Sequence, residues 1–371
     1  MFLAASNVGH KICRPQDLVI NTLWAWMAAL GVSRYTGIVS PAYGVYRPLD
    51  PDKFLPRFAD LLLRTPMYAD EYQRCSTGVN SSRLRLYAEY FLRIPILLPS
   101  PDEQAAIVRF LDHANRKIDG FIRAKKRELS LITEMLLTVT EESLVQSDSE
   151  VMRLSTAAML VNRPIDRRSS ENYTRIGLFN RGRGIFHKPT VSGAELGDSD
   201  FFSIEEGDLV ISGQFAWEGS VALAREKDKG CIASHRYPIL RGRDNLISSA
   251  ALLAILRTKL GGMLMDHHSR GAAGRNRPLN ITTLLKEKFP IPSLSAQVRI
   301  TDLLEKEYMV SQTIARSIWL VDEYRTRLTA DIVTGKLDVR EAAAKLPEET
   351  PEEGVEVEFS EEETELEEAE A

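Results

Sequence analysis

The chain has 371 residues, 44% of them hydrophobic and 27% charged, which is enough for two or more domains that each bury a core. No stretch approaches the roughly 18 to 20 uninterrupted apolar residues of a membrane helix, and the N-terminus lacks a secretory signal pattern, so we expect a cytoplasmic protein. Cys13, Cys75 and Cys231 are far apart and have no histidine at metal-ligand spacing. This argues against a disulfide framework and against a metal site.

The formal net charge of -5 hides an uneven distribution. Residues 341–371 hold fourteen of the 52 acidic residues and only Lys345 among the 47 basic ones, which leaves a body of charge +8. A basic body suits a polyanion-binding surface, because each neutralised phosphate releases counterions. The acidic segment repels itself and has almost no aromatics, so we expect it to be disordered, as a solubilising terminus rather than a regulatory DNA mimic.

The chain contains two copies of one pattern. Asp-Leu-Val-Ile occurs at 17–20 and again at 208–211, and each copy is followed by Ala-Trp. From Ser76 opposite Ser269 onward, the two copies stay 193 residues apart. Because positions shared by both copies are more often structural than specific, we predict that Trp26 and Trp217 are core residues.

Each copy runs from a segment rich in aromatic and turn residues, across a proline-containing boundary, into a long helical pattern. We therefore predict an α+β fold in which two mixed-β domains with short helices are separated by two long helices. The expected boundaries are residues 1–97 for the first domain, 98–148 for the first long helix, 149–291 for the second domain, 292–340 for the second long helix and 341–371 for the disordered acidic tail.

Apolar residues recur every three, four and seven positions in both helical runs, as in a coiled-coil seam. Because a whole domain separates the runs, the second helix can return along the first, which predicts antiparallel pairing. Each helix of about 40 residues would be about 60 Å long and would act as a spacer, although a dimerisation element would have the same pattern. The seam is expected to contain Ile107, Leu111, Ile118, Phe121, Ile132 and Met135, with Ile300, Leu304, Ile314, Ile318 and Leu328 on the second helix.

Three segments carry a resemblance to a known family. They are DLVINTLWAWMAALGVSRYTGIVSPAYGVYRP at 17–48, ILLPSPDEQAAIVRFLDHANRKID at 96–119 and LTADIVTGKLDVR at 328–340. These segments resemble the specificity subunits of type I restriction-modification systems, and the resemblance covers nearly the whole chain. It implies two target-recognition domains, each of which recognises one half of a bipartite double-stranded DNA site.

The resemblance also implies partners and cofactors. The long helices would dock two methyltransferase subunits, and translocase-nuclease subunits would join the complex. S-adenosylmethionine, ATP and Mg would be bound by those partner subunits and none by this chain, which would be a recognition subunit rather than an enzyme.

The sequence departs from the family pattern in the first domain. About 55 residues of the second domain precede Asp208, whereas sixteen residues precede Asp17. We therefore expect the first recognition domain to lack its opening third, which corresponds to the region around Tyr173–Phe186.

Candidate DNA contacts follow from the side chains that recognise base edges, chiefly Arg for guanine and Asn or Gln for adenine. Glycines such as Gly182 and Gly184 permit tight turns and close approach to phosphate, although turn and capping roles are an alternative for the same residues. The candidates are Asn21, Trp24, Tyr43, Arg47, Asn80 and Arg83 in the first domain, and Arg175, Asn180, Arg181, Arg183, Lys188, Gln214, His235, Arg236, Arg270, Arg275, Asn276 and Arg277 in the second.

The sequence shows no signature of catalysis. It contains no GxxxxGK[ST], HExxH or GxSxG motif, and the spacing around Gly182 does not fit a GxGxxG loop. Two alternatives to the specificity subunit stay open. One is a truncated relic that binds methyltransferase subunits without selective DNA recognition, and the other is a free-standing DNA-binding regulator.

Overall fold

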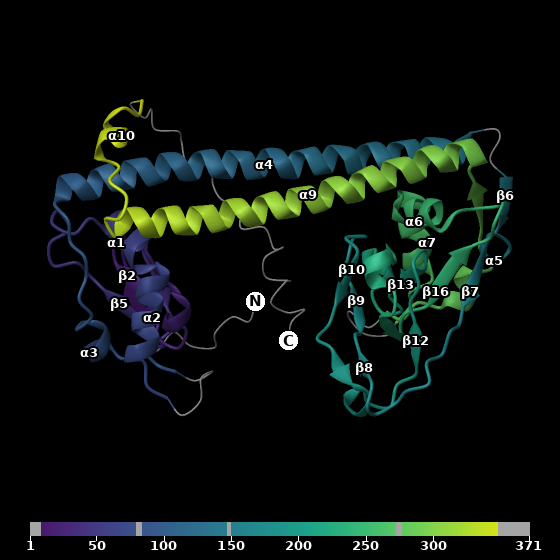
Figure 1. Cartoon of the computed structure of the whole chain (residues 1–371), viewed down its shortest axis with the longest axis horizontal. Helices are drawn as coiled ribbons and strands as arrows, with labels where there is room; N and C mark the ends of the chain where they lie inside the picture. Colours follow the sequence, from purple (N-terminus) through teal and green to yellow (C-terminus); the bar gives the residue numbers. More distant parts are fainter. Residues whose placement is uncertain (1–8, 79–83, 147–149, 272–276, 348–371) are drawn as a thin grey trace. The chain divides into compact units, whose positions relative to one another are not determined.

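The computed structural model describes residues 9–78, 84–146, 150–271 and 277–347. The chain divides into two compact units, unit 1 with Met1–Phe121 and Trp319–Ala371, and unit 2 with Ile122–Ile318. Both dividing points lie inside long helices, α4 (Pro101–Val145) and α9 (Leu294–Val333), so that each unit contains part of both (Figure 1). The predicted α+β class with two long helices is confirmed.

Unit 2 is built on a four-stranded antiparallel sheet. Its strands, in the order β14 (Val221–Leu223), β13 (Leu209–Ile211), β16 (Ile239–Gly242) and β7 (Ala158–Val161), pair through backbone hydrogen bonds. Helix α6 (Ser249–Arg257) packs on this sheet, and its residues 250–256 are all buried. A helix that is apolar on every side must be covered on every side. Helix α9 contributes to this cover, because its residues Ile300 and Leu304 belong to the same core as α6.

Shorter elements complete unit 2. A second core around Val210, Ala233 and Ile176 lies between the central strand and the two-stranded ribbons. The ribbons pair β9 (Ile176–Leu178) with β10 (Ile185–His187), β8 (Asn172–Tyr173) with β11 (Val191–Ser192), β12 (Phe201–Ser203) with β15 (Ile232–Ser234) and β6 (Glu150–Arg153) with β17 (Lys288–Ile291). The remaining helices are α5 (Leu154–Ala157), α7 (Lys259–His267) and α8 (Ile281–Leu284), with 3-10 turns at Gly193–Glu195, Ala216–Glu218 and Glu226–Asp228.

Unit 1 repeats part of this arrangement. Its sheet has the order β3 (Leu30–Val32), β2 (Leu18–Asn21) and β5 (Tyr43–Tyr46), and the ribbon β1 (Lys11–Cys13) with β4 (Gly37–Val39) stands for β12 with β15. Its helices are α1 (Pro56–Leu63), α2 (Pro66–Cys75) and α3 (Ala88–Phe91), with a 3-10 turn at Ala25–Met27. Each helix begins 193 residues before its counterpart among α6, α7 and α8, so the duplication seen in the sequence is structural. Among the described residues of unit 1, no strand corresponds to β6–β11.

The long helices pair in opposite directions within each unit. In unit 1, Ile107 and Leu111 share a core with Ile332, and Arg325 is bonded to Asp119. In unit 2, Leu136 shares a core with Ile300 and Leu304.

The predicted seam needs two corrections. Phe121 is 40% exposed, and Met135 is 48% exposed, so neither is a buried seam residue. The buried positions at this end of α4 are instead Leu136, Thr140 and Leu144, four residues apart. The other predicted seam residues are buried or half-buried: Ile107, Leu111, Ile118, Ile132, Ile300, Leu304, Ile314, Ile318 and Leu328.

The chain continues on unit 1 after α9. Residues Arg340–Ala344 form a short helix, α10, in which Ala343 is buried, so the expectation of disorder from residue 341 is wrong for this turn. The rest of the predicted disordered tail, from residue 348, lies outside the described residues. In the described part of the chain, no helix combines the length and apolarity needed to cross a bilayer.

Candidate nucleic-acid interface

Three loops of unit 2 meet at Gly213, where the central strand β13 ends. The amide of Gly213 donates to the carbonyl of Arg236 (2.7 Å), and its own carbonyl accepts from the amide of Leu279 (2.8 Å). A Cβ atom at position 213 would lie 2.6 Å from the Arg236 oxygen, so only glycine allows this approach. The segments after β13, before β16 and before α8 are therefore held together at one end of the sheet.

The turn between β9 and β10 joins the same end. Backbone amides of Arg181 and Gly182 donate to the carbonyls of Glu218 (2.9 Å) and Gly219 (2.8 Å), and the side-chain amide of Asn180 donates to the Glu218 carboxylate. Arg181 has a positive φ of 58°, which is uncommon for a residue with a side chain and fixes the turn. The exposed side chains of Arg181 and Arg183 are carried by this turn.

An aromatic and arginine pair completes the end of the sheet. The guanidinium of Arg277 lies over the ring of Trp217 (4.8 Å to the centroid) and donates to Asp266 (2.7 Å) and to the Ser269 carbonyl (3.1 Å). The indole N–H of Trp217 donates to the Gln214 carbonyl (3.2 Å), which leaves the Gln214 side chain half-buried beside it. These bonds hold Arg277 in one position, as a side chain that binds a base or phosphate requires.

The structure brings five predicted contacts of unit 2 to this end, which we call the loop end: Asn180, Arg181, Gln214, Arg236 and Arg277. Arg183, on the same turn as Arg181, packs over Phe179 (5.5 Å). His235 is exposed next to Arg236, and its amide donates to the Asp200 carbonyl (3.0 Å).

Other predicted contacts lie elsewhere in unit 2. Arg175 and Lys188 lie at the opposite end of the β9 and β10 ribbon, where the Lys188 amide donates to the Arg175 carbonyl (2.8 Å). The Arg175 Nε atom is buried and has no hydrogen-bond partner among the described residues. Arg270 donates to the His267 carbonyl (3.2 Å) at the end of α7. Arg275 and Asn276 lie outside the described residues, as do Asn80 and Arg83 of the first domain.

The end of the unit 1 sheet has the same construction. The amide of Thr22 donates to the carbonyl of Ala42 (3.4 Å), and its carbonyl accepts from the amide of Leu86 (2.9 Å), as Gly213 does with its two loops. Asn21 is half-buried and accepts from the Leu23 amide (3.1 Å), and Trp24 is 51% exposed on the following turn. The two sheets therefore present loops of the same construction, with different side chains.

We predicted that Trp26 and Trp217 are core residues, and this prediction is wrong. Both are half-buried, and the fully buried residue of each shared Ala-Trp pair is the alanine, Ala25 or Ala216. The 3-10 turn points the small residue into the core and leaves the tryptophan at the rim. In unit 2 that rim position is what makes Trp217 available to Arg277.

A buried aspartate precedes the central strand in each unit. Asp208 accepts from Arg163 (2.7 and 2.9 Å) and Arg241 (2.7 Å), and burial raises its pKa less than the hydrogen bonds from Arg163, Glu205 and Arg241 lower it. In unit 1, Arg47 donates twice to Asp17 (2.7 Å each) and thereby lowers the pKa of that carboxyl. The guanidinium of Arg47, predicted as a DNA contact, is thus engaged by Asp17, as Arg241 is by Asp208.

The sequence contained a signal for these ion pairs. Asp17 and Asp208 belong to the shared Asp-Leu-Val-Ile, and Arg47 stands opposite Arg241. A charged pair that is present in both copies indicates a structural role. Side chains that recognise the bases of two different half-sites would differ between the two copies.

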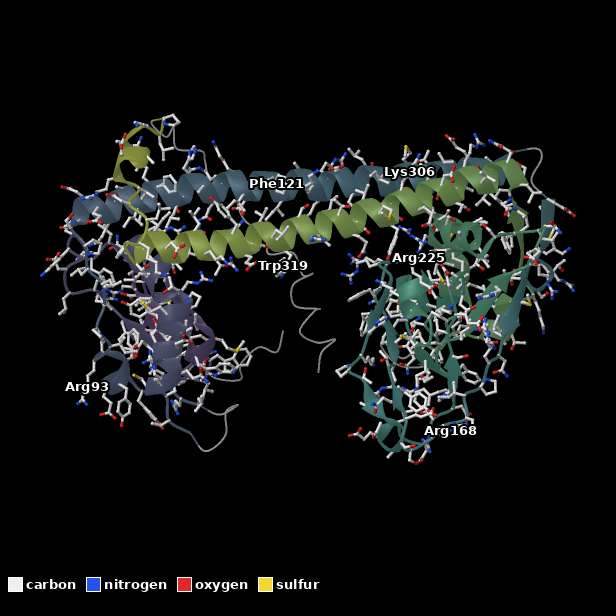
Figure 2. The ribbon with its side chains drawn as sticks, viewed as in Figure 1. Arg93, Phe121, Arg168, Arg225, Lys306 and Trp319 are labelled. Atoms are coloured by element: carbon white, nitrogen blue, oxygen red, sulfur yellow. The ribbon has the colours of Figure 1, made fainter. Side chains whose placement is uncertain are left out.

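Figure 2 labels two further arginines of unit 2. Arg168 lies far from the long helices, and Arg225 lies beside α9 (Figure 2), where it is bonded to Glu305 and lies over Tyr308 (4.4 Å).

Among the described residues, no group of three His, Cys, Asp or Glu side chains could hold a metal ion.

Part of the chain matches the model of a known protein family. Residues 150–314 match the family model described as the type I restriction modification DNA specificity domain. No curated protein sequence matches the chain.

Three solved structures match the chain. One, described as the basis of complex assembly and conformational transition of the type I R-M system, has a TM-score of 0.58 at 15% identity and covers 90% of this chain and 85% of its own. The HsdS subunit from Thermoanaerobacter tengcongensis has a TM-score of 0.43 at 17% identity and covers 91% and 84%. The type I restriction-modification S subunit from M. genitalium has a TM-score of 0.41 at 13% identity and covers 87% and 84%.

Proposed function

We propose that this chain, whose residues 150–314 belong to the type I restriction modification DNA specificity domain family, is the DNA specificity subunit of a type I restriction-modification complex. Its substrate is double-stranded DNA with a bipartite target. Each unit recognises one half of that target through the loop end of its sheet.

The observation that carries this proposal is the repeated construction of the loop end. Gly213 in unit 2 and Thr22 in unit 1 each bind the same two neighbouring loops through one donated and one accepted backbone hydrogen bond. The framework is therefore shared, while the side chains on it differ, with Gln214 and Arg236 in unit 2 and Leu23 and Ala42 in unit 1. A constant frame with variable side chains suits two recognition sites for two different base sequences.

The long helices supply the remaining part of the proposal. Both α4 and α9 have a paired face and a second face with exposed apolar side chains, including Leu131, Met309, Trp319 and Leu320. Exposed apolar side chains on a paired helix favour a protein partner. We assign this face to two methyltransferase subunits, with translocase-nuclease subunits joining the complex through them.

Chemistry in such a complex belongs to the partners. S-adenosylmethionine would be bound by the methyltransferase subunits, and ATP and Mg by the translocase-nuclease subunits. The part played by this chain is to position the methyltransferase on its target base, without a cofactor of its own.

One observation favours a second candidate function, the relic that binds methyltransferase subunits without selective recognition. Among the described residues, unit 1 has no counterpart of β6–β11 or of the turn that carries Arg181. A unit without that turn has fewer donors to offer to base edges.

Co-expression with a methyltransferase subunit, followed by selection of bound oligonucleotides from a random pool, separates the candidates. A specificity subunit gives a stable complex that enriches a split sequence. The relic gives an equally stable complex with no enriched sequence. Selective binding by the lone chain, without complex formation, would contradict both and indicate a free-standing regulator.

A further inference from the structure

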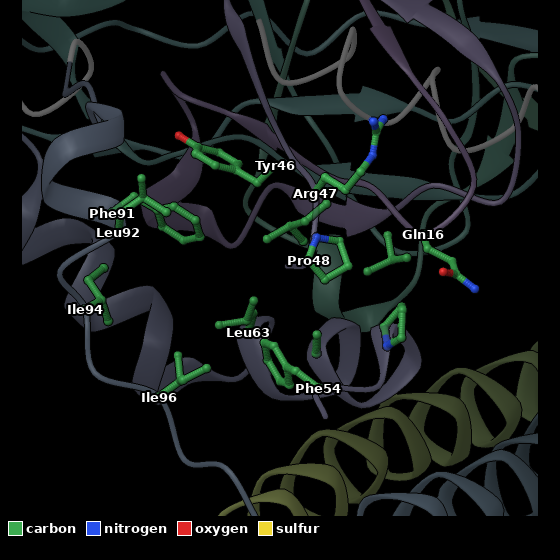
Figure 3. A pocket seen from close by; sticks show the side chains of 14 residues that line it. Gln16, Tyr46, Arg47, Pro48, Phe54, Leu63, Phe91, Leu92, Ile94 and Ile96 are labelled. Atoms are coloured by element: carbon green, nitrogen blue, oxygen red, sulfur yellow. The ribbon is translucent and has the colours of Figure 1, made fainter. Parts of the chain in front are cut away.

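Unit 1 contains an apolar pocket of about 280 Å³ beside strand β5 (Figure 3). Its lining includes Leu18, Tyr46, Phe54, Leu63, Phe91 and Ile96, and Arg47 is the one charged side chain in it. Ile96 and the adjacent Leu97 and Leu98 are each about two-fifths exposed. Such a concentration of apolar surface at a sheet edge indicates a surface that binds another segment.

The duplicated unit shows what fills the same place. At a distance of 193 residues, Leu63, Phe91 and Ile96 correspond to Leu256, Leu284 and Phe289. Those three residues are buried in one core with Leu154, Ala157 and Ala158, which belong to α5 and the start of β7. The pocket of unit 1 is therefore the space that a strand-forming segment occupies in unit 2.

The neighbouring strand edge leads to the same conclusion. Tyr46 corresponds to Leu240, because each pairs with the leucine of the shared motif, Leu18 or Leu209. In unit 2, Leu240 also pairs with Leu160 of β7 on its other side. In unit 1, β5 is the outer strand among the described residues, and its edge is open to a further strand.

The path of the chain favours one occupant. In unit 2 the filling segment follows directly after α4, since β6 begins at Glu150. After α9 the chain likewise continues on unit 1, where Val339 is buried and Arg109 donates to the carbonyls of Leu346 (2.6 Å) and Pro347 (3.3 Å).

Arg109 connects this path to the pocket. It lines a second hollow, which shares Gln16, Val32 and Pro56 with the apolar pocket, so the two hollows are neighbours. Beyond Pro347 the sequence reaches Val355-Glu-Val-Glu-Phe359, in which apolar and acidic residues alternate with the period of a strand. The seven residues between Pro347 and Val355 can span up to about 25 Å.

We infer that Val355–Phe359 binds in this pocket as a fourth strand on the open edge of β5. Val355, Val357 and Phe359 then face the apolar lining, while Glu356 and Glu358 face solvent and exposed arginines. The described residues that line this pocket include no carboxylate, and Arg64 and Arg93 lie next to lining residues in the chain. This inference concerns the completion of unit 1 and does not depend on DNA recognition.

A second copy of the chain is a poorer occupant. Lending its β7 segment would remove Leu154, Ala157 and Ala158 from its own core, where each is at most 2% exposed. The apolar surface uncovered in one molecule would offset what is covered in the other. Binding of residues 355–359 would not take any described residue out of its core.

Hydrogen-deuterium exchange on the full chain tests the inference. We expect amides of residues 355–359 and of β5 to exchange about tenfold or more slowly than in a variant carrying Val355→Asp, Val357→Asp and Phe359→Asp. Leu366→Asp, a substitution of the same kind outside residues 355–359, should leave those residues and β5 protected. Exchange at 355–359 as fast in the wild type as in the triple variant would overturn the inference.

Photo-crosslinking identifies the occupant. A benzoylphenylalanine residue in place of Phe359 should crosslink within one chain to peptides containing Tyr46–Pro48 or Phe91–Ile96. Crosslinks to unit 2, or crosslinks between chains that increase with protein concentration, would overturn the assignment of the pocket to the chain's own tail.

Discussion

Asp208 is a residue on which the frame of unit 2 depends, because a fully buried carboxylate binds two arginines there. Asp208→Asn keeps the shape but removes the charge that compensates Arg163, so we expect the free energy of unfolding to fall by about 3 kcal/mol. Denaturant titration measures this. Asp338→Asn is the matched control, since Asp338 binds Arg340 at the surface, and it should change stability little.

The same carboxylate predicts a dependence on pH. The pKa of Asp208 lies below its ordinary value, so its contribution to stability is complete above the unfolded-state pKa and is lost as the pH falls through the folded-state pKa. Stability measured between about pH 7 and pH 3 should therefore decline less steeply for Asp208→Asn than for the wild type. Equal slopes would show that the carboxylate is not compensated in the folded state.

Arg236 tests recognition at the residue scale. Its backbone carbonyl accepts from the Gly213 amide, while its side chain is exposed, so Arg236→Ala keeps the loop and removes the donor. We expect discrimination at one base of one half-site to fall by about 1 to 3 kcal/mol. Arg168→Ala, at the distal end of unit 2, is the control, and equal weakening on all sequences by Arg236→Ala would assign Arg236 to phosphate.

At the scale of elements, one glutamine at the start of each long helix binds a loop of its own unit. Gln297 donates to the carbonyls of Leu246 (2.7 Å) and Pro292 (3.0 Å) and accepts from the Ser248 amide (3.0 Å). Gln104 makes the same three bonds in unit 1 with Lys53, Pro99 and Leu55.

Removal of this fastening should be costly. Gln297→Ala leaves buried backbone groups unpaired, so we expect a loss of about 1 to 3 kcal/mol and faster hydrogen exchange at residues 246–248. Ser295→Ala, on the exposed side of the same turn, should do neither. Unchanged exchange in the glutamine variant would mean that helix packing alone positions the loop.

A buried ion pair sets the position of α9 on α6. Glu307 accepts twice from Arg257 (2.6 and 2.7 Å) and once from Thr133 of α4 (2.5 Å). Burial raises the pKa of Glu307, but the bonds from Arg257 and Thr133 lower it by more, so the pKa lies below its ordinary value. Glu307→Ala should cost about 3 kcal/mol or more, whereas Glu307→Leu with Arg257→Met should cost much less, because no charge is left unpaired. A larger loss in the double variant by thermal unfolding would contradict this.

Periodicity and repetition were sufficient to predict the two long helices and the duplicated order of elements, because both depend on regular spacing. They failed where a local turn decides the outcome. The 3-10 turn buries Ala25 and Ala216 rather than the tryptophans, and α4 shifts its buried face to Leu136. The loop end joins segments far apart in sequence through backbone bonds, which no side-chain pattern records.

For the whole molecule, the central claim is that two units of one chain recognise two halves of one DNA site. The framework repeated at Thr22 and Gly213 supports recognition by both units. The 45-residue helix α4 is continuous, and each unit contains part of it.

The most direct test is to co-express the chain with its methyltransferase subunit in a host free of DNA methylation and to map modified bases by single-molecule sequencing. We predict a split motif whose two halves are separated by a spacer of constant length. A single half-motif, or no methylation by a complex that assembles normally, would contradict recognition by both units.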